Sequence, residues 1–251
     1  MNAGFFPQQF RPNGKQISRS FRTQNSGSAS VSQGRKRDRL AVEPRTQSAQ
    51  MMRQQATEAA RSRNYTRAIE LLCQAIAVDG GTAIDYNNRG LMYFYSGNIE
   101  SAIADYNCAI ELNPQLAQAY NNRGNSHAAQ GLLVEAMLDY EMAIDLNPFN
   151  VRALINQGIT LRDLEIYPLA LENFDIALGM AQLEGHIYAE RGRTYHVMGE
   201  WNAAIADYRR ALQLLAEGKA DECKDAASRL RSRVETWQEQ LLSPRQSDFH
   251  A

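Results

Sequence analysis

Residues 83–116 and 117–150 are two 34-residue segments of nearly the same sequence, and they align without a gap. The letters YNNRG at 86–90 return at 120–124, and the pattern AxxDYxxAIxLNP at 102–114 returns at 136–148. An internal period of roughly 20 to 50 residues is typical of arrays in which short structural units stack on one another. We therefore expect the chain to grow along one axis, unit by unit.

Within the first segment, turn-forming residues divide the apolar pattern into two helices. The Ser-Gly-Asn sequence at 96–98 predicts a tight turn between a helix that ends near Tyr95 and a second helix over about 99–112. Pro114 ends the second helix, because proline lacks the N–H needed to continue it. Small residues such as Gly90 and Ala102 let two antiparallel helices approach closely. One such hairpin cannot bury both of its faces, so it needs neighbours.

This arrangement of small, aromatic and proline positions resembles the tetratricopeptide repeat. The resemblance implies an all-α fold, a right-handed α-solenoid of helix-turn-helix units, and the binding of other proteins. The sequence of the repeats is similar to that of repeat proteins common in cyanobacteria and plastids. Extending the register predicts five repeats, at 49–82, 83–116, 117–150, 151–184 and 185–218. The first repeat ends in Gly80 and Gly81 instead of proline, since glycine accepts the left-handed geometry that ends a helix.

The residues after 218 depart from the repeat register. Between 223 and 241, apolar residues recur at spacings that alternate between four and three, which predicts one amphipathic helix. We interpret residues 219–242 as a helix that caps the last repeat, with a coiled-coil or dimer seam as the alternative. Residues 243–251 are expected to form a disordered end.

The first 48 residues lie outside the predicted repeats. They are rich in Gln, Asn, Ser, Gly and Arg without any helical or strand period, which predicts a disordered tail. The tail holds nine Lys or Arg residues and two acidic ones, about +7, so the remainder of a chain of net charge −1 carries about −8. Its basic cluster admits three interpretations, namely a solvated charge run, a contact for nucleic acid or anionic membrane, and a nuclear address. The cluster consists of Arg35, Lys36, Arg37 and Arg39.

Apolar runs and cysteines bear on the compartment. No run approaches the roughly 20 apolar residues of a membrane span, and the start of the chain has no apolar signal-peptide core. Cys73, Cys108 and Cys223 fall within helical patterns and do not form a disulfide framework. We therefore expect a soluble protein of a reducing compartment, the cytoplasm. An organelle transit peptide, and hence a plastid location, is the alternative for the Arg- and Ser-rich start.

The resemblance also implies a binding groove. In this family the first helices line a concave surface, and the sixth position of a repeat often bonds the backbone of an extended peptide. Here three successive repeats place Asn88, Asn122 and Asn156 at that position. An amide suits this role because it offers both a donor and an acceptor. The alternative interpretation is that these asparagines only bond neighbouring helices.

Other residues would share this groove by the same resemblance. They are Arg53, Leu91, Phe94, Tyr95, Asn121, Asn125, Arg152, Arg162 and Arg193. An apolar, amide-lined middle between basic ends predicts a partner segment with an apolar anchor flanked by carboxylates. A solvated face with scattered arginines is the alternative.

Several functions are not expected. A clamp for chaperone tails needs a fixed set of Lys, Asn and Arg positions, and the registers that start at Arg53, Asn87 and Asn121 each lack a member. The chain has no P-loop, no GxGxxG after a strand and no HExxH, and its four histidines have no ligand-like spacing. We therefore expect no enzyme, cofactor or metal. The aspartates that recur at 105, 139 and 207 are expected on a solvated face.

These expectations lead to one functional hypothesis and two rivals. The first is a non-enzymatic scaffold or assembly factor that holds an extended segment of another protein in its groove. The second is an adaptor whose basic tail binds nucleic acid or anionic membrane while the repeats recruit a protein partner. The third is regulation within the chain, with the basic tail lying on the acidic repeats.

Overall fold

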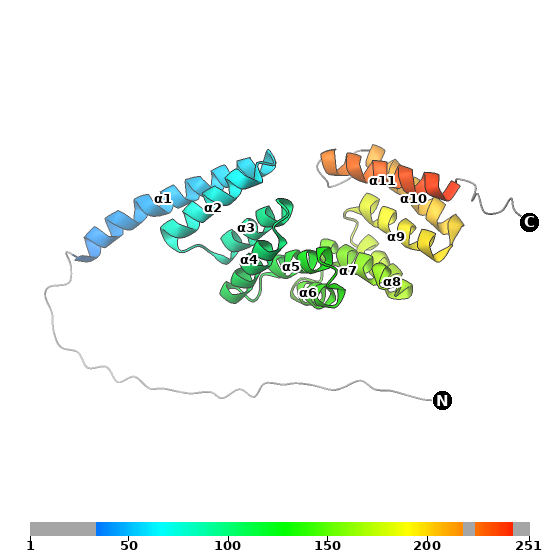
Figure 1. Ribbon diagram of the computed structural model, residues 1–251, viewed down its shortest axis with the longest axis horizontal. Helices are drawn as coiled ribbons and strands as arrows, with labels where there is room; N and C mark the ends of the chain where they lie inside the picture. The colour runs from blue at the N-terminus through cyan, green and yellow to red at the C-terminus, as the bar shows by residue number, and fades with distance from the viewer. Residues whose placement is uncertain (1–33, 218–223, 243–251) are drawn as a thin grey trace, which may run out of the picture. The chain divides into compact units, whose positions relative to one another are not determined.

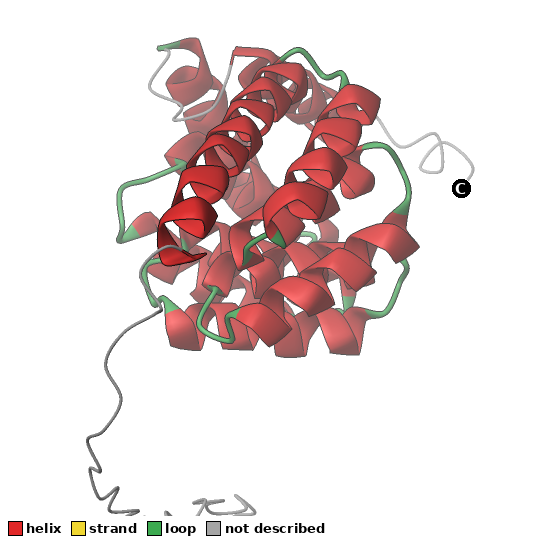
Figure 2. Ribbon diagram, turned by 90° about the vertical axis from the view of Figure 1, so that its left-hand side faces the viewer, coloured by secondary structure: helices red, strands yellow, loops and turns green. Residues whose placement is uncertain are grey.

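The computed structural model describes residues 34–217 and 224–242, and it describes side chains from residue 47 in the first range and from 226 in the second. The chain divides into two units, 1–42 and 43–251, and the second contains all the predicted repeats. The described residues of the chain form eleven helices and no strand (Figures 1 and 2). The helices are α1 Gly34–Arg61, α2 Tyr65–Asp79, α3 Ala83–Tyr95, α4 Ile99–Leu112, α5 Ala117–Ala129, α6 Leu133–Leu146, α7 Val151–Asp163, α8 Tyr167–Leu178, α9 Glu184–Met198, α10 Trp201–Ala216 and α11 Lys224–Leu242.

The helices stack in chain order as five pairs and a final helix. The second helix of each pair packs on the first helix of the next, α2 on α3, α4 on α5, α6 on α7 and α8 on α9. The first helices α3, α5, α7 and α9 also contact one another in succession, and α11 packs on α10 and α9. The expected fold class, an all-α solenoid of helix pairs closed by a C-terminal helix, is confirmed.

The first helix begins earlier than the sequence predicted. Residues 1–48 were expected to be disordered, but α1 starts at Gly34. The segment 35–41 contains Arg, Lys, Leu and Ala, which favour helix by intrinsic propensity. Its apolar residues show no period, and the prediction rested on periodicity, so the extension was missed. Residues 1–33 and the predicted disordered end, 243–251, lie outside the described residues.

Local side-chain chemistry sets the helix ends. Thr82 begins α3 with a capping box, in which its hydroxyl accepts from the Asp85 backbone N–H and the Asp85 carboxylate accepts from the Thr82 N–H. Asn98 caps α4 by accepting from the Ser101 N–H at 3.1 Å. Gly80 ends α2 with φ of 89°, the left-handed geometry for which glycine is suited.

Within each pair the two helices touch through a glycine and an aromatic ring. At Gly124 on α5, an added Cβ would lie 2.7 Å from a ring carbon of the fully buried Tyr140 on α6. Gly90 and Tyr106, Gly158 and Phe174, and Gly192 and Tyr208 repeat this contact, with added-Cβ distances of 2.8 to 2.9 Å to the ring. Glycine at this position therefore fixes how closely the two helices of a repeat approach.

Replacing Gly124 with Ala should lower the free energy of unfolding by about 2 kcal/mol, because the methyl group overlaps the Tyr140 ring in a packed core. Urea denaturation followed by circular dichroism would measure the change. The control is Gly179→Ala at the end of α8, where φ is −61° and the nearest atom is 3.3 Å away. Equal stability of the two variants would mean that the ring moves aside without cost.

Ion pairs also join the first and second helices within a repeat. Arg89 on α3 donates from Nε and Nη2 to the two carboxylate oxygens of Asp105 on α4, at 2.7 and 2.6 Å. The pairs Arg123–Asp139 and Arg191–Asp207 repeat this contact. In the fourth repeat the same two positions hold Gln157 and Asn173, and the Asn173 amide donates to the Gln157 oxygen at 2.9 Å.

These pairs correct the expectation for the recurring aspartates. The recurring aspartates were expected on a solvated face, yet Asp105, Asp139 and Asp207 are buried, with exposed fractions of 4 to 6%. The arginine that holds each of them also reaches the second helix of the preceding repeat, as Arg123 does by donating from Nη1 to Asn107 at 2.7 Å. The recurrence therefore reflects a contact that ties three helices together.

The described residues also bear on membrane spans, metal sites and thiols. None of their helices is long and apolar enough to cross a membrane. None of their His, Cys, Asp and Glu side chains forms a group of three or more suited to a metal ion. Cys73 and Cys108 are free thiols in this part of the chain.

Candidate functional site

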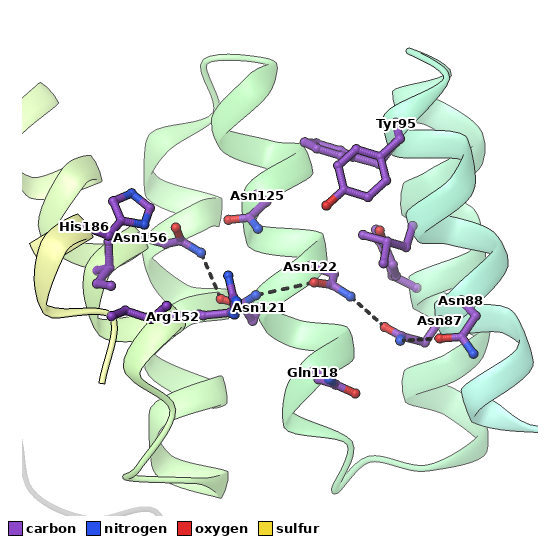
Figure 3. A pocket seen from close by; sticks show the side chains of 15 residues that line it. Asn87, Asn88, Tyr95, Gln118, Asn121, Asn122, Asn125, Arg152, Asn156 and His186 are labelled. Atoms are coloured by element: carbon purple, nitrogen blue, oxygen red, sulfur yellow. Dashed lines mark hydrogen bonds between the residues drawn. The ribbon is translucent and has the colours of Figure 1, made fainter. Parts of the chain in front are cut away.

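Nine of the twelve predicted groove residues line one cavity of about 410 Å³ on α3, α5 and α7 (Figure 3). They are Asn88, Leu91, Phe94, Tyr95, Asn121, Asn122, Asn125, Arg152 and Asn156. The first helices provide them because successive first helices lie side by side and turn the same face to this surface. We call this cavity the amide pocket.

The asparagines of the amide pocket form a hydrogen-bonded zigzag across the three helices (Figure 3). The Asn156 amide donates to Asn121 at 3.1 Å, and the Asn122 amide donates to Asn87 at 3.0 Å. Longer contacts between neighbours in the sequence join these links, from Asn121 to Asn122 at 3.4 Å and from Asn87 to Asn88 at 3.5 Å. Each amide is thus oriented by the next, which fixes the polar groups of the pocket floor before any ligand arrives.

The zigzag shows the alternative role considered for the asparagines, bonds between neighbouring helices. Asn122 and Asn156 do bond neighbouring helices, through the buried Asn87 and Asn121 behind them. The exposed Asn88 ends the chain of amides, and none of the hydrogen bonds found among the described residues uses the N–H groups of its side-chain amide. Sequence reasoning missed Asn87, although the doubled asparagines at 87–88 and 121–122 were a signal of two facing rows.

A tyrosine hydroxyl in the amide pocket is left without a partner. Tyr106 is fully buried and lines the pocket, and its hydroxyl has no hydrogen bond among the described residues. In the third repeat the Tyr140 hydroxyl donates to Asn125 at 2.9 Å, and in the fifth the Tyr208 hydroxyl lies 3.1 Å from a ring nitrogen of His196. Burial raises the pKa of Tyr106 well above its usual value, so its hydroxyl stays protonated.

The sequence explains why Tyr106 is the exception. One repeat before Asn125 stands Leu91, which offers no polar atom. A buried hydroxyl without a hydrogen bond costs about 1 to 3 kcal/mol. A ligand group that reaches this hydroxyl would recover part of that cost.

Aromatic side chains form one wall of the pocket. Tyr95 on α3 is 56% exposed, and its ring stacks on that of Tyr65 on α2 with 5.4 Å between centroids. Phe94 meets the same ring edge-on at 5.8 Å. This wall offers a rigid apolar surface to a ligand at little cost in side-chain entropy.

Arg53 lies outside the amide pocket because its charge is used within the chain. From α1 it donates to both oxygens of Asp85 at 2.7 Å and to both oxygens of Asp79 at 2.8 and 2.9 Å. Burial raises the pKa of Asp85, but hydrogen bonds from Arg53 and Thr82 outweigh it, and the pKa lies below its usual value. Arg53 therefore fastens the first repeat to the second.

Arg162 and Arg193 also have partners elsewhere. Arg162 donates at 2.8 Å to the buried carboxylate of Glu190 on α9, which accepts from Arg233 of α11 at 3.1 Å. Arg193 stacks over the ring of Trp237 with 5.5 Å to its centroid. The positive charge predicted at the ends of the groove is therefore largely used within the chain, because these arginines join α7, α9 and α11.

Arg152 is the groove arginine that faces solvent. Its side chain is exposed, and no ion pair or hydrogen bond to it is found among the described residues. It lines the amide pocket and also a second, larger cavity of about 880 Å³. The larger cavity lies between the first repeat and α11, and Tyr95 and His186 line both cavities.

Sequence reasoning missed the arginines of this second cavity on α11. Arg229 and Arg233 follow the point where the repeat register fails, so no repeat position could be assigned to them. The predicted basic cluster at 35–39 falls in the first turns of α1, where side chains are not described.

Comparisons with known proteins agree with this architecture. Family models described as "TPR repeat" and "Tetratricopeptide repeat" match residues 90–131 and 117–150. A thermophilic TPR protein of Thermus thermophilus is 17% identical with a TM-score of 0.63, covering 76% of this chain and 98% of its own. The pilF protein of Pseudomonas aeruginosa is 17% identical with a TM-score of 0.60, covering 79% and 94%. MamA is 18% identical with a TM-score of 0.56, covering 65% and 96%.

No sequence among the curated proteins matches the chain. The two family models, the 34-residue period and the stacked helix pairs show that this chain contains tetratricopeptide repeats. Repeats of this kind are generally modules that bind other proteins and do not catalyse reactions.

Proposed function

We propose that this protein is an interaction scaffold that holds an extended segment of a partner protein in the amide pocket. The single observation that carries the proposal is the buried Tyr106 hydroxyl, which lines the pocket and has no partner in the described part of the chain. Two other repeats supply a partner for the equivalent hydroxyl from within the chain. In the second repeat a bound segment takes that place.

The rest of the pocket suits a peptide. The oriented amides offer donors and acceptors that match a peptide backbone whatever its side chains are. The exposed ring of Tyr95 beside them suits an apolar anchor residue. Because the amides are already held by one another, little ordering is needed when the segment binds.

A random 12-residue peptide library displayed on phage, selected on the full-length chain, tests this proposal. Enriched peptides would be synthesised and their affinities measured by calorimetry. Tyr106→Phe and Asn88→Ala should each weaken binding about three- to tenfold, because each removes one hydrogen bond to the ligand. Tyr106→Phe should at the same time leave the stability unchanged or raised, since it removes an unsatisfied buried group.

Two variants serve as matched controls. Tyr208→Phe removes a hydroxyl that already has a partner within the chain, away from the amide pocket, and Asn202→Ala removes an exposed amide on α10. Both should keep the affinity of the parent chain. Peptides that bind Tyr106→Phe and Asn88→Ala as tightly as the parent would place the binding site outside the amide pocket.

A further inference from the structure

The cavity between the first repeat and α11 is lined by a cluster of cationic side chains. Among the residues whose side chains are described, its lining includes five arginines and one histidine and no Asp or Glu. These residues are Arg61, Arg63, Arg152, Arg229, Arg233 and His186. We call this cavity the arginine mouth. It lies within the unit of residues 43–251, of which residues 49–251 carry about −8, so the positive charge here is local.

The arginines of the mouth differ in whether they pair with a carboxylate of the chain. Arg233 is held by Glu190 and stacks on Trp237 with 4.7 Å to the ring centroid, which fixes α11 against α9. Arg61 has a contact of 3.5 Å to Glu58, and both side chains are 75% exposed, so this contact is weak. Arg152 and Arg229 are exposed, and no carboxylate is found beside either among the described residues.

The mouth and the amide pocket form one continuous surface, because Arg152, Tyr95 and His186 line both. A segment that lies along the asparagines can therefore continue into the mouth. The rings of Tyr65 and Tyr95 form part of its lining, together with the apolar Met92 and Leu230. This surface suits a chain that carries carboxylates next to apolar side chains.

We propose that the arginine mouth binds an acidic stretch of the partner, with Arg229 of α11 and Arg152 of α7 pairing its carboxylates. The inference rests on the proposed function, since the same segment occupies the amide pocket. Guanidinium groups pair carboxylates through two parallel hydrogen bonds, which makes arginine the suitable residue. The cap helix thus provides one wall of the site as well as closing the solenoid.

A short acidic peptide fits this surface better than a nucleic acid does. Cationic side chains gather in the mouth, while residues 49–251 as a whole carry about −8. A long polyanion would extend beyond the mouth over a unit of net negative charge, whereas a peptide can place its few carboxylates inside the mouth. The amides beside the mouth match a peptide backbone in addition.

Fluorescence anisotropy with a labelled hexaglutamate peptide and the full-length chain tests the inference. The parent should bind hexaglutamate and not hexaglutamine, and Arg229→Glu should weaken binding at least about tenfold. Arg231→Glu is the matched control. Arg231 is also exposed on α11, but it pairs with Glu235 at 2.9 Å and does not line the mouth. Both variants keep the basic N-terminal residues, so the difference between them reports the mouth alone.

Two results would overturn the inference. Equal weakening by Arg229→Glu and Arg231→Glu would mean general attraction between charges. Tighter, Arg229-dependent binding of a twelve-residue oligothymidylate than of hexaglutamate would make the mouth a nucleic-acid site. The library peptides separate this failure from that of the proposed function. If they still depend on Tyr106 and Asn88 while hexaglutamate ignores Arg229, only the inference about the mouth is lost.

Discussion

Replacing Arg89 with Gln should lower the free energy of unfolding by about 3 kcal/mol. The change leaves the Asp105 carboxylate, 5% exposed, without the guanidinium that donates to both of its oxygens. Breaking a buried pair from one side typically costs about 3 to 5 kcal/mol, and we expect the lower end because Arg89 is 18% exposed. Urea denaturation would give the size of the loss, and hydrogen exchange should locate it in α3 and α4.

The fourth repeat provides the matched control for this prediction. The double change Arg89→Gln with Asp105→Asn installs the neutral pair that Gln157 and Asn173 form there. A neutral amide pair leaves no buried charge, so the double variant should recover to within about 1 kcal/mol of the parent. A double variant as unstable as the single one would show that the loss comes from the shape of the arginine and not from the stranded carboxylate.

Replacing Glu190 with Gln should also cost about 3 kcal/mol and should loosen the cap helix. Glu190 is 1% exposed and accepts from Arg162 at 2.8 Å and from Arg233 at 3.1 Å. The amide keeps the shape of the side chain but leaves the largely buried Arg162 without its main counter-charge. We expect faster hydrogen exchange in α11, because Arg233 ties that helix to α9 through this carboxylate.

Glu235→Gln is the control for the Glu190 prediction. Glu235 also faces an arginine, but its pair with Arg231 lies on the surface of α11, with side chains 45 and 53% exposed. Surface pairs of this kind contribute at most about 1 kcal/mol. If α11 exchanged at the parent's rate in Glu190→Gln, its attachment would rest on apolar contacts such as those of Leu230 and Val234.

The Glu190 variant bears on binding as well. Arg229 reaches the arginine mouth from α11, so a loosened α11 should weaken hexaglutamate binding in the Glu190 variant. The same variant should bind the library peptides that need only Tyr106 and Asn88. The two parts of the surface can thus be separated without any change to the residues that contact the ligand.

The sequence alone determined the helix pairs and their order. The 34-residue period, the Ser-Gly-Asn turn at 96–98 and the residues that stop each helix act over a few positions, so they could be read from the chain. The family resemblance then named the first-helix positions that line the amide pocket. The extension of α1 to Gly34 was not predicted from the sequence, because helix propensity without an apolar period is a weak signal.

Only the tertiary structure decided which polar groups are paired within the chain and which line the two cavities. Arg53 and Arg162 satisfy carboxylates 26 to 32 residues away, and Arg233 satisfies one 43 residues away. No local pattern reports such pairs, because the partners meet only when neighbouring repeats stack. The Tyr106 hydroxyl is left unpaired for the same reason, since its environment depends on the side chain that the facing helix supplies at position 91. The repeat fixes the scaffold, and the departures from it, at Leu91 and in α11, shape the proposed binding surface.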